Sequence, residues 1–166
     1  MPNGLLEFDN VIPMIQPVDL ATGAVTPWID MATAHRVAFL CNFGVVTSSA
    51  SDSFAITVEC GSVGDTAAGE GTAVPFQYRL SSAVNTNTWG AVTAAAATGY
   101  VGNCTVISGK NVWVDVDPAQ AQATLDTGRY LRLVFAQDGS AAIGGVTAFI
   151  QTRYHMTTMI STTVST

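Results

Sequence analysis

The sequence contains little charge. Of its 166 residues only 11% are charged, against roughly 25% in typical soluble domains, and Lys110 is the only lysine. Six basic residues stand against twelve acidic ones, which gives a formal net charge of −6 at pH 7. Clustered cations are needed to neutralise nucleic-acid phosphates or to hold an anionic membrane surface. The composition therefore predicts neither a nucleic-acid partner nor a membrane partner.

A basic leader and a long apolar run are also missing. Residues 1–10 contain Glu7 and Asp9 but no basic residue, so they lack the charged start of a signal peptide. The longest uncharged stretch, residues 80–109, is rich in Ser, Thr, Asn and Gly, which a membrane-spanning helix does not carry so densely. We therefore expect neither export nor a membrane span.

Cysteine and histidine are few and scattered. Cys41, Cys60 and Cys104 form no CxxC pair and are odd in number. We interpret all three as reduced residues in or near the core, which fits assembly in a bacterial cytoplasm. His35 and His155 have no cysteine or carboxylate at ligand spacing. The sequence thus predicts no metal site and no cofactor.

Motifs for catalysis are absent from the sequence: it has no G-x-S-x-G, P-loop or H-E-x-x-H pattern. Asp115 and Asp117 are two residues apart on a strand, so their carboxylates share a face about 7 Å apart. A calcium site, or a glycan hydrolase that also uses Glu59, is conceivable from these acids. We interpret the pair instead as a solvated strand end in which Asp117 caps the next helix. The chain is predicted not to be an enzyme, with no catalytic residues.

What the sequence does contain is the periodicity of strands. Apolar and polar residues alternate in Ser53–Cys60, Val74–Leu80 and Asn111–Asp117, which is typical of strands buried on one face. Arg36–Phe43 and Tyr130–Ala136 are more continuously apolar and indicate central strands. The remaining predicted strands are Val11–Gln16, Pro27–Met31, Thr88–Val92 and Val146–Tyr154. The pattern predicts about nine strands.

One segment has a helical pattern. Asp117 is a good N-cap and Pro118 suits the first helical position, so Pro118–Leu125 is predicted as a short helical turn between two strands. Many short strands separated by turns favour an all-β fold, an antiparallel β-sandwich of jelly-roll type. We expect one domain over 1–166, with an extended N-terminal segment (about 1–20) and a Thr/Ser-rich C-terminal arm (about 155–166). Its prolines restrict 11–16 to an edge strand or an arm.

The tryptophans are the candidate binding residues. Trp28, Trp89 and Trp113 are spread over three segments and could form a carbohydrate platform. Trp113 shares a strand face with Asp115 and Asp117, and two interpretations of it stay open. Either it is exposed as an anchor for another molecule, or that face is covered within the domain.

Several segments resemble a known group of proteins. Asp9–Pro13 with Pro17–Leu20, and Val114–Asp117 continuing through Leu125–Leu133, are similar to segments of small virion proteins of tailed bacteriophages, encoded beside the major capsid protein. In this chain these segments read V-D-V-D, a short helix and L-D-T-G-R-Y, and they are followed by a closing strand that ends near Arg153. The resemblance implies a β-sandwich on the outside of a capsid, as in a trimeric decoration (cement) protein.

We therefore expect a structural virion protein, made in the host cytoplasm, that binds the capsid exterior and stabilises the shell. Its expected partners are the major capsid protein and copies of itself, arranged with threefold symmetry. Strand addition by the two terminal segments would supply backbone hydrogen bonds. The alternative is a phage adhesin or tail-associated module that recognises host surface glycans. The candidate subunit-contact residues are Phe8, Val11, Ile12, Met14, Trp113, Met156, Met159, Ile160 and Val164.

Overall fold

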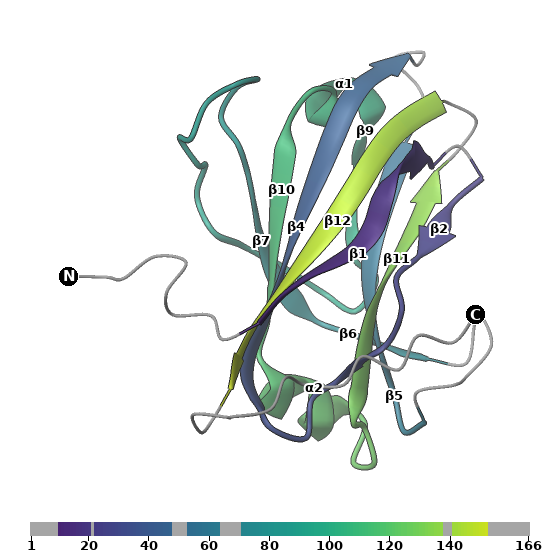
Figure 1. The fold of residues 1–166 in the computed structure, drawn as a ribbon, viewed down its shortest axis with the longest axis vertical. Coiled ribbons are helices and arrows are strands. Elements are labelled where there is room, and N and C mark those ends of the chain that lie inside the picture. The colour runs from purple at the N-terminus through teal and green to yellow at the C-terminus, as the bar shows by residue number, and fades with distance from the viewer. Residues whose placement is uncertain (1–9, 21, 48–52, 64–70, 138–140, 153–166) are drawn as a thin grey trace.

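Two antiparallel sheets pack face to face in the computed structural model of the chain, which describes residues 10–20, 22–47, 53–63, 71–137 and 141–152 (Figure 1). Sheet A has the order β1-β12-β4-β10-β7-β8. Its strands are β1 (Asn10–Asp19), β12 (Ala141–Thr152), β4 (Ala34–Thr47), β10 (Asn111–Val116), β7 (Phe76–Leu80) and β8 (Thr93–Ala95). Sheet B consists of β2 (Ala24–Val25), β3 (Ile29–Asp30), β11 (Tyr130–Gln137), β5 (Ser53–Gly61), β6 (Thr72–Val74) and β9 (Tyr100–Asn103). The predicted all-β sandwich is confirmed.

The strand pairing is that of a jelly roll. Successive strands pair from the two ends of the chain inward: β1 with β12, β2 and β3 with β11, β4 with β10, and β5 with β9. These nested pairs close into two sheets because β12 also pairs with β4 and β11 also pairs with β5. A long antiparallel hairpin wrapped in this way is a double-sheet jelly roll.

One predicted strand divides between the sheets. Val74–Leu80 keeps its alternation throughout, but β6 pairs with β5 in sheet B and β7 pairs with β10 in sheet A. The chain crosses at Pro75, which needs no ladder hydrogen bond at this corner. It then forms β8 and returns to sheet B as β9.

The strand count and some boundaries were predicted wrongly. The described residues contain twelve strands rather than about nine. Thr88–Val92 is not a strand, because only Trp89 bridges to Ser81 and the strand begins at Thr93. Strand β9 was missed, and the predicted strand at Pro27–Met31 is only two residues long. Short strands of small residues carry too little alternation to be recognised.

There are two short helices in the described residues, not one. Helix α2 (Pro118–Thr124) begins as predicted, since the Asp117 carboxylate accepts a hydrogen bond of 2.9 Å from the Ala119 N–H. Helix α1 (Cys104–Ile107) was not predicted; Asn103 caps it by accepting from the Thr105 N–H at 2.8 Å. The two helices lie at opposite ends of the sandwich (Figure 1).

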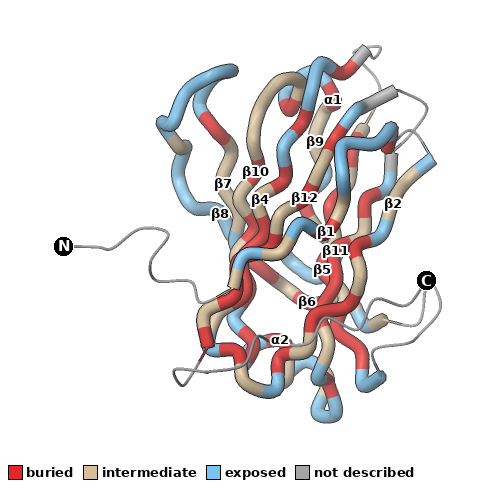
Figure 2. The backbone as a smooth tube through the Cα atoms, in the orientation of Figure 1, coloured by how far each residue is buried: buried red, intermediate tan, exposed pale blue. Residues whose placement is uncertain are grey.

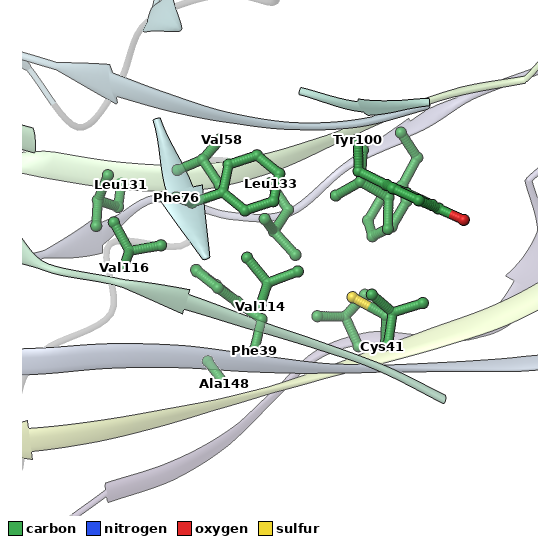
Figure 3. Close-up of a cluster of buried hydrophobic side chains, with 14 of the residues drawn as sticks. Phe39, Cys41, Val58, Phe76, Tyr100, Val114, Val116, Leu131, Leu133 and Ala148 are labelled. Atoms are coloured by element: carbon green, nitrogen blue, oxygen red, sulfur yellow. The ribbon is translucent and has the colours of Figure 1, made fainter. Parts of the chain in front are cut away.

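The core lies between the sheets and follows the predicted alternation. In β10, and in β5 as far as Cys60, every second residue is buried and the others are half-buried (Figure 2). Phe39 and Val114 of sheet A face Val58 and Leu133 of sheet B (Figure 3). Side chains that interdigitate in this way hold the two sheets together by excluding water from both inner faces.

All three cysteines are buried, as predicted. Burial raises the pKa of the Cys60 thiol to about 11 and raises the pKa of Cys41 still further. A thiol in such surroundings stays protonated and packs as a small apolar side chain.

Candidate functional site

The outer face of sheet A brings together residues from five strands. Trp113 of β10 lies opposite Leu40 of β4 on one side and Arg79 of β7 on the other. Beside it runs a second cross-strand row on the same face. That row consists of Val11, Phe149, Ala38, Asp115 and Gln77. Two of the predicted contact residues, Val11 and Trp113, therefore share one face of the molecule.

Three aromatic rings form a continuous cluster on this face, the aromatic cluster (Trp89, Trp113, Phe149). The ring centroids of Trp113 and Phe149 are 5.3 Å apart, and those of Trp113 and Trp89 are 6.4 Å apart with nearly perpendicular planes. Arg79 places its guanidinium 5.7 Å from the Trp89 ring centroid. Trp113 is half-buried, so it packs within the domain and still presents part of its ring to solvent.

An ion pair lies next to the aromatic cluster. The Arg36 Nε–H donates to both carboxylate oxygens of Asp115, at 2.9 and 3.1 Å, and the Arg36 Nη2 also contacts this carboxylate. The Arg36 side chain is 38% exposed and that of Asp115 is 23% exposed. Because two parallel contacts join the groups, the guanidinium plane is held in one orientation.

Two adjoining hollows flank this ion pair, and together they are called the polar groove. The larger hollow has a volume of about 340 Å³ and is bordered by His35, Asp117 and Gln120. The smaller hollow, about 160 Å³, is bordered by Trp113 and Val92. Arg36, Gln77 and Asp115 line both hollows. The polar groove thus has a polar end and an aromatic end.

A second surface lies at the end of the sandwich where β1 and β4 finish and β12 begins. Four exposed aliphatic side chains define this apolar end. They are Val18 (47% exposed), Val45 (79%), Val106 (43%) and Ile143 (55%). Val18 lies opposite Gly144 and Ile143 lies opposite Asp19, so Val18 and Ile143 belong to opposite faces of sheet A at this end. Helix α1, which carries Val106, lies against β4.

A groove of about 440 Å³ opens beside the apolar end, between β1, β12 and β4. Pro13, Pro17 and Ile143 are among its walls, and Gly144 and Gly145 also line it. The pairing of β12 with β4 has a register shift between Ala142 and Gly144, as at a β-bulge. A Cβ on Gly144 would lie 2.7 Å from Leu20 Cδ1, so a side chain there would push into the core.

The predicted contact residues occupy different positions in the fold. Val11 is 52% exposed on β1, whereas Ile12 is half-buried against the core. Met14 lies in the core of its own chain, with 9% exposure, because it points inward from β1. The other five lie outside the described residues: Phe8, Met156, Met159, Ile160 and Val164.

Each of the three acids considered for catalysis interacts with a different partner. Asp115 pairs with Arg36 and Asp117 caps α2, as described above. Glu59 lies on sheet B, where its Oε2 accepts a hydrogen bond of 2.8 Å from Arg132 Nε. No group of three or more histidines, cysteines or acids that could hold a metal ion occurs among the residues that the structure describes.

The tryptophans do not form a single platform. Trp89 and Trp113 meet on sheet A, but Trp28 is 3% exposed and stacks on Arg132, an outward-facing residue of sheet B, at 4.3 Å. The third ring of the aromatic cluster is that of Phe149, not that of Trp28. The sequence did not single it out, because Ala148–Ile150 is continuously apolar and hides the alternation that marks an outer face.

No protein-family model matches the chain, and no curated protein matches it. Across the described part of the chain, no helix has the length and apolar character required to cross a membrane.

Proposed function

We propose that this protein is a structural protein of a tailed-phage virion, a decoration (cement) protein that binds the outer surface of the capsid through its apolar end. The observation that carries the proposal is that Val18, Val45, Val106 and Ile143, which belong to β1, β4, α1 and β12, are all exposed at one end of the sandwich. Exposed apolar patches on soluble proteins mark interaction sites. Covering this end on a capsid would remove the four side chains from water.

The segment that resembles phage virion proteins supports the proposal at the level of the scaffold. It runs through β10, α2 and β11, and so links sheet A to sheet B. Val114 and Val116 fill the core, Asp117 caps α2, and Gly128 allows the chain to enter β11. These residues build the sandwich, and the contact surface is carried by other elements.

The β1 edge of sheet A is better suited to side-chain packing than to strand addition. Strand β1 contains Pro13 and Pro17 as well as two register shifts. Prolines and bulges leave an edge poorly able to pair with another strand. We therefore expect the capsid to be contacted through the apolar end and its neighbouring groove, not through the part of β1 between the prolines.

The test is cosedimentation of the purified protein with empty shells assembled from the major capsid protein of the same phage. Ile143→Asp should weaken shell binding at least roughly tenfold, because it places a charge in an apolar contact. Val63→Asp is the matched control: Val63 is also 55% exposed, but it follows the far end of β5. Light scattering of the free protein measures whether it forms the expected trimer.

Two results would overturn the proposal. One is that the wild-type protein does not sediment with the shells. The other is that the Ile143 and Val63 variants bind equally well, which would remove the apolar end from the contact.

A further inference from the structure

We propose that the polar groove on the outer face of sheet A binds a neutral saccharide, with Trp113 as the stacking surface and Gln77, Arg36 and Asp115 as the hydrogen-bonding groups. This binding site goes beyond the proposed structural function. It lies on a face of the sandwich, whereas the proposed capsid contact lies at one end.

The aromatic end of the groove suits the apolar face of a sugar ring. Trp113 borders the smaller hollow and is half-buried. Phe149 and Trp89 pack against its ring at centroid distances of 5.3 and 6.4 Å. Because both neighbours restrain the indole, a ligand would not have to order it on binding, which lowers the entropic cost.

The middle of the groove suits hydroxyl groups. Gln77 offers an amide donor and an amide acceptor, and Arg36 and Asp115 offer guanidinium N–H groups and carboxylate oxygens. Planar groups of this kind can engage two neighbouring hydroxyls at once, one as donor and one as acceptor. The ion pair fixes two of the three side chains in advance.

The charge of the groove favours an uncharged ligand. Arg36 is paired with Asp115. Arg79 lines the smaller hollow and lies over the Trp89 ring, and Asp117 adds a negative charge at the polar end. The formal charges of these four side chains sum to zero. A phosphate or carboxylate ligand therefore meets no excess of positive charge in the groove, and a polyol needs none.

The size of the groove suits a short ligand. The larger hollow, at about 340 Å³, falls at the lower end of the range for small-ligand pockets, roughly 300–1,000 Å³. Its neighbour extends the surface past Trp113. We expect one sugar ring over Trp113 and a second near Gln120, at the polar end.

The experiment is a calorimetric titration of the free full-length protein with defined saccharides. The neutral probes are maltotriose, cellotriose, chitotriose and lactose, and the charged comparators are trigalacturonate and glucose 6-phosphate. The expected result is binding of at least one neutral probe and of neither charged comparator. Binding of none of the four neutral probes, or binding of the charged comparators alone, would overturn the proposal. No capsid shell is present, so the result does not depend on the proposed capsid contact.

Variants locate the binding. Gln77→Ala and Gln120→Ala should each weaken binding of the best neutral probe by roughly tenfold, the loss of about one hydrogen bond. Gln122→Ala is the matched control, because Gln122 belongs to the same helix and does not line the groove. Thermal unfolding of each variant checks that it is folded. A folded Gln77→Ala protein that binds as tightly as the wild type would overturn the assignment of the site.

Discussion

Arg132 is the only charged residue in the buried class among the residues that the structure describes. Its side chain is 3% exposed, lies against the Trp28 ring and pairs with Glu59. Breaking a buried pair by removing one partner leaves a charge without compensation. We predict that Glu59→Ala lowers the free energy of unfolding by about 3–5 kcal/mol, measured by urea denaturation.

A second ion pair serves as the control for this prediction. Asp30 accepts hydrogen bonds from Arg129 Nε at 2.9 Å and from Nη2 at 2.6 Å, but the Arg129 side chain is 54% exposed. Water and salt screen such a pair. Asp30→Ala should therefore destabilise the protein much less than Glu59→Ala does. If both variants lost the same free energy of unfolding, burial of Arg132 would not be the cause of the larger destabilisation expected for Glu59→Ala.

Asp30 also predicts a pH dependence. The hydrogen bond from Arg129 is the largest influence on this carboxyl and holds its pKa below the ordinary 3.8. Since the folded pKa is the lower one, the carboxylate contributes its full stabilisation above about pH 4 and loses it as the pH falls through the folded pKa. Asp30→Asn should remove this part of the acid destabilisation. Urea midpoints measured between about pH 5 and pH 2 check it; unchanged slopes would contradict it.

At the same scale, the strand face on which Trp113 lies could be predicted from the sequence, but the residues that pack against it could not. The alternation of Val112, Val114 and Val116 assigns Trp113 to the outer face of its strand, and the structure bears this out. Phe149 is 36 positions further along the chain, and only the shared pairing of β10 and β12 with β4 brings the two rings together. The alternation of apolar and polar residues predicts which face of the sheet a side chain lies on. It does not predict which other strand lies beside its own.

At the scale of elements, close packing accounts for Gly128. It lies between α2 and β11, where the chain turns back toward sheet B. A Cβ at this position would lie 2.4 Å from Cys60 Sγ and 2.8 Å from the Leu125 carbonyl oxygen. The backbone oxygen cannot move away without disturbing the end of α2. Glycine is thus required by the close packing of this connection.

We predict that Gly128→Ala lowers the free energy of unfolding by about 1–3 kcal/mol, the usual cost of overpacking. Gly90→Ala is the control, because its Cβ would meet only the Leu80 carbonyl oxygen at an ordinary 3.4 Å. Chemical denaturation of both variants measures the difference. Equal stabilities of the two variants would contradict the packing argument.

Elements with strong alternation were the ones that could be predicted. Ser53–Cys60 and Asn111–Asp117 lie within one or two residues of β5 and β10. Strands β8 and β9 consist largely of Thr, Ala, Gly and Asn, and their positions depend on the partners β7 and β5. Whether such a segment forms a strand depends on its partner strand in the fold, because its local sequence preference is too weak to determine it.

At the scale of the whole molecule, the jelly roll depends on pairs far apart in the chain. Asn10 lies opposite Ile150, and Tyr130 lies opposite Gly61. Composition and turn spacing predict a sandwich, but no local pattern specifies such partners. The apolar end has the same origin, since Val18, Val45 and Ile143 come from three strands that meet only in the folded sheet. For this reason the proposed contact surface was not among the residues predicted from sequence.

The apolar character of that end predicts how the proposed capsid contact depends on salt and temperature. A contact formed by Val18, Val45, Val106 and Ile143 gains stability from the removal of apolar surface from water, which salt does not screen. Shell binding should therefore persist in about 1 M sodium chloride, where the screening length is about 3 Å, and should show a negative heat-capacity change. Cosedimentation across a salt series and calorimetry at several temperatures measure the two quantities. Release of the protein at high salt would instead identify charged groups as the source of binding, and the contact would then have to be sought on another face of the sandwich.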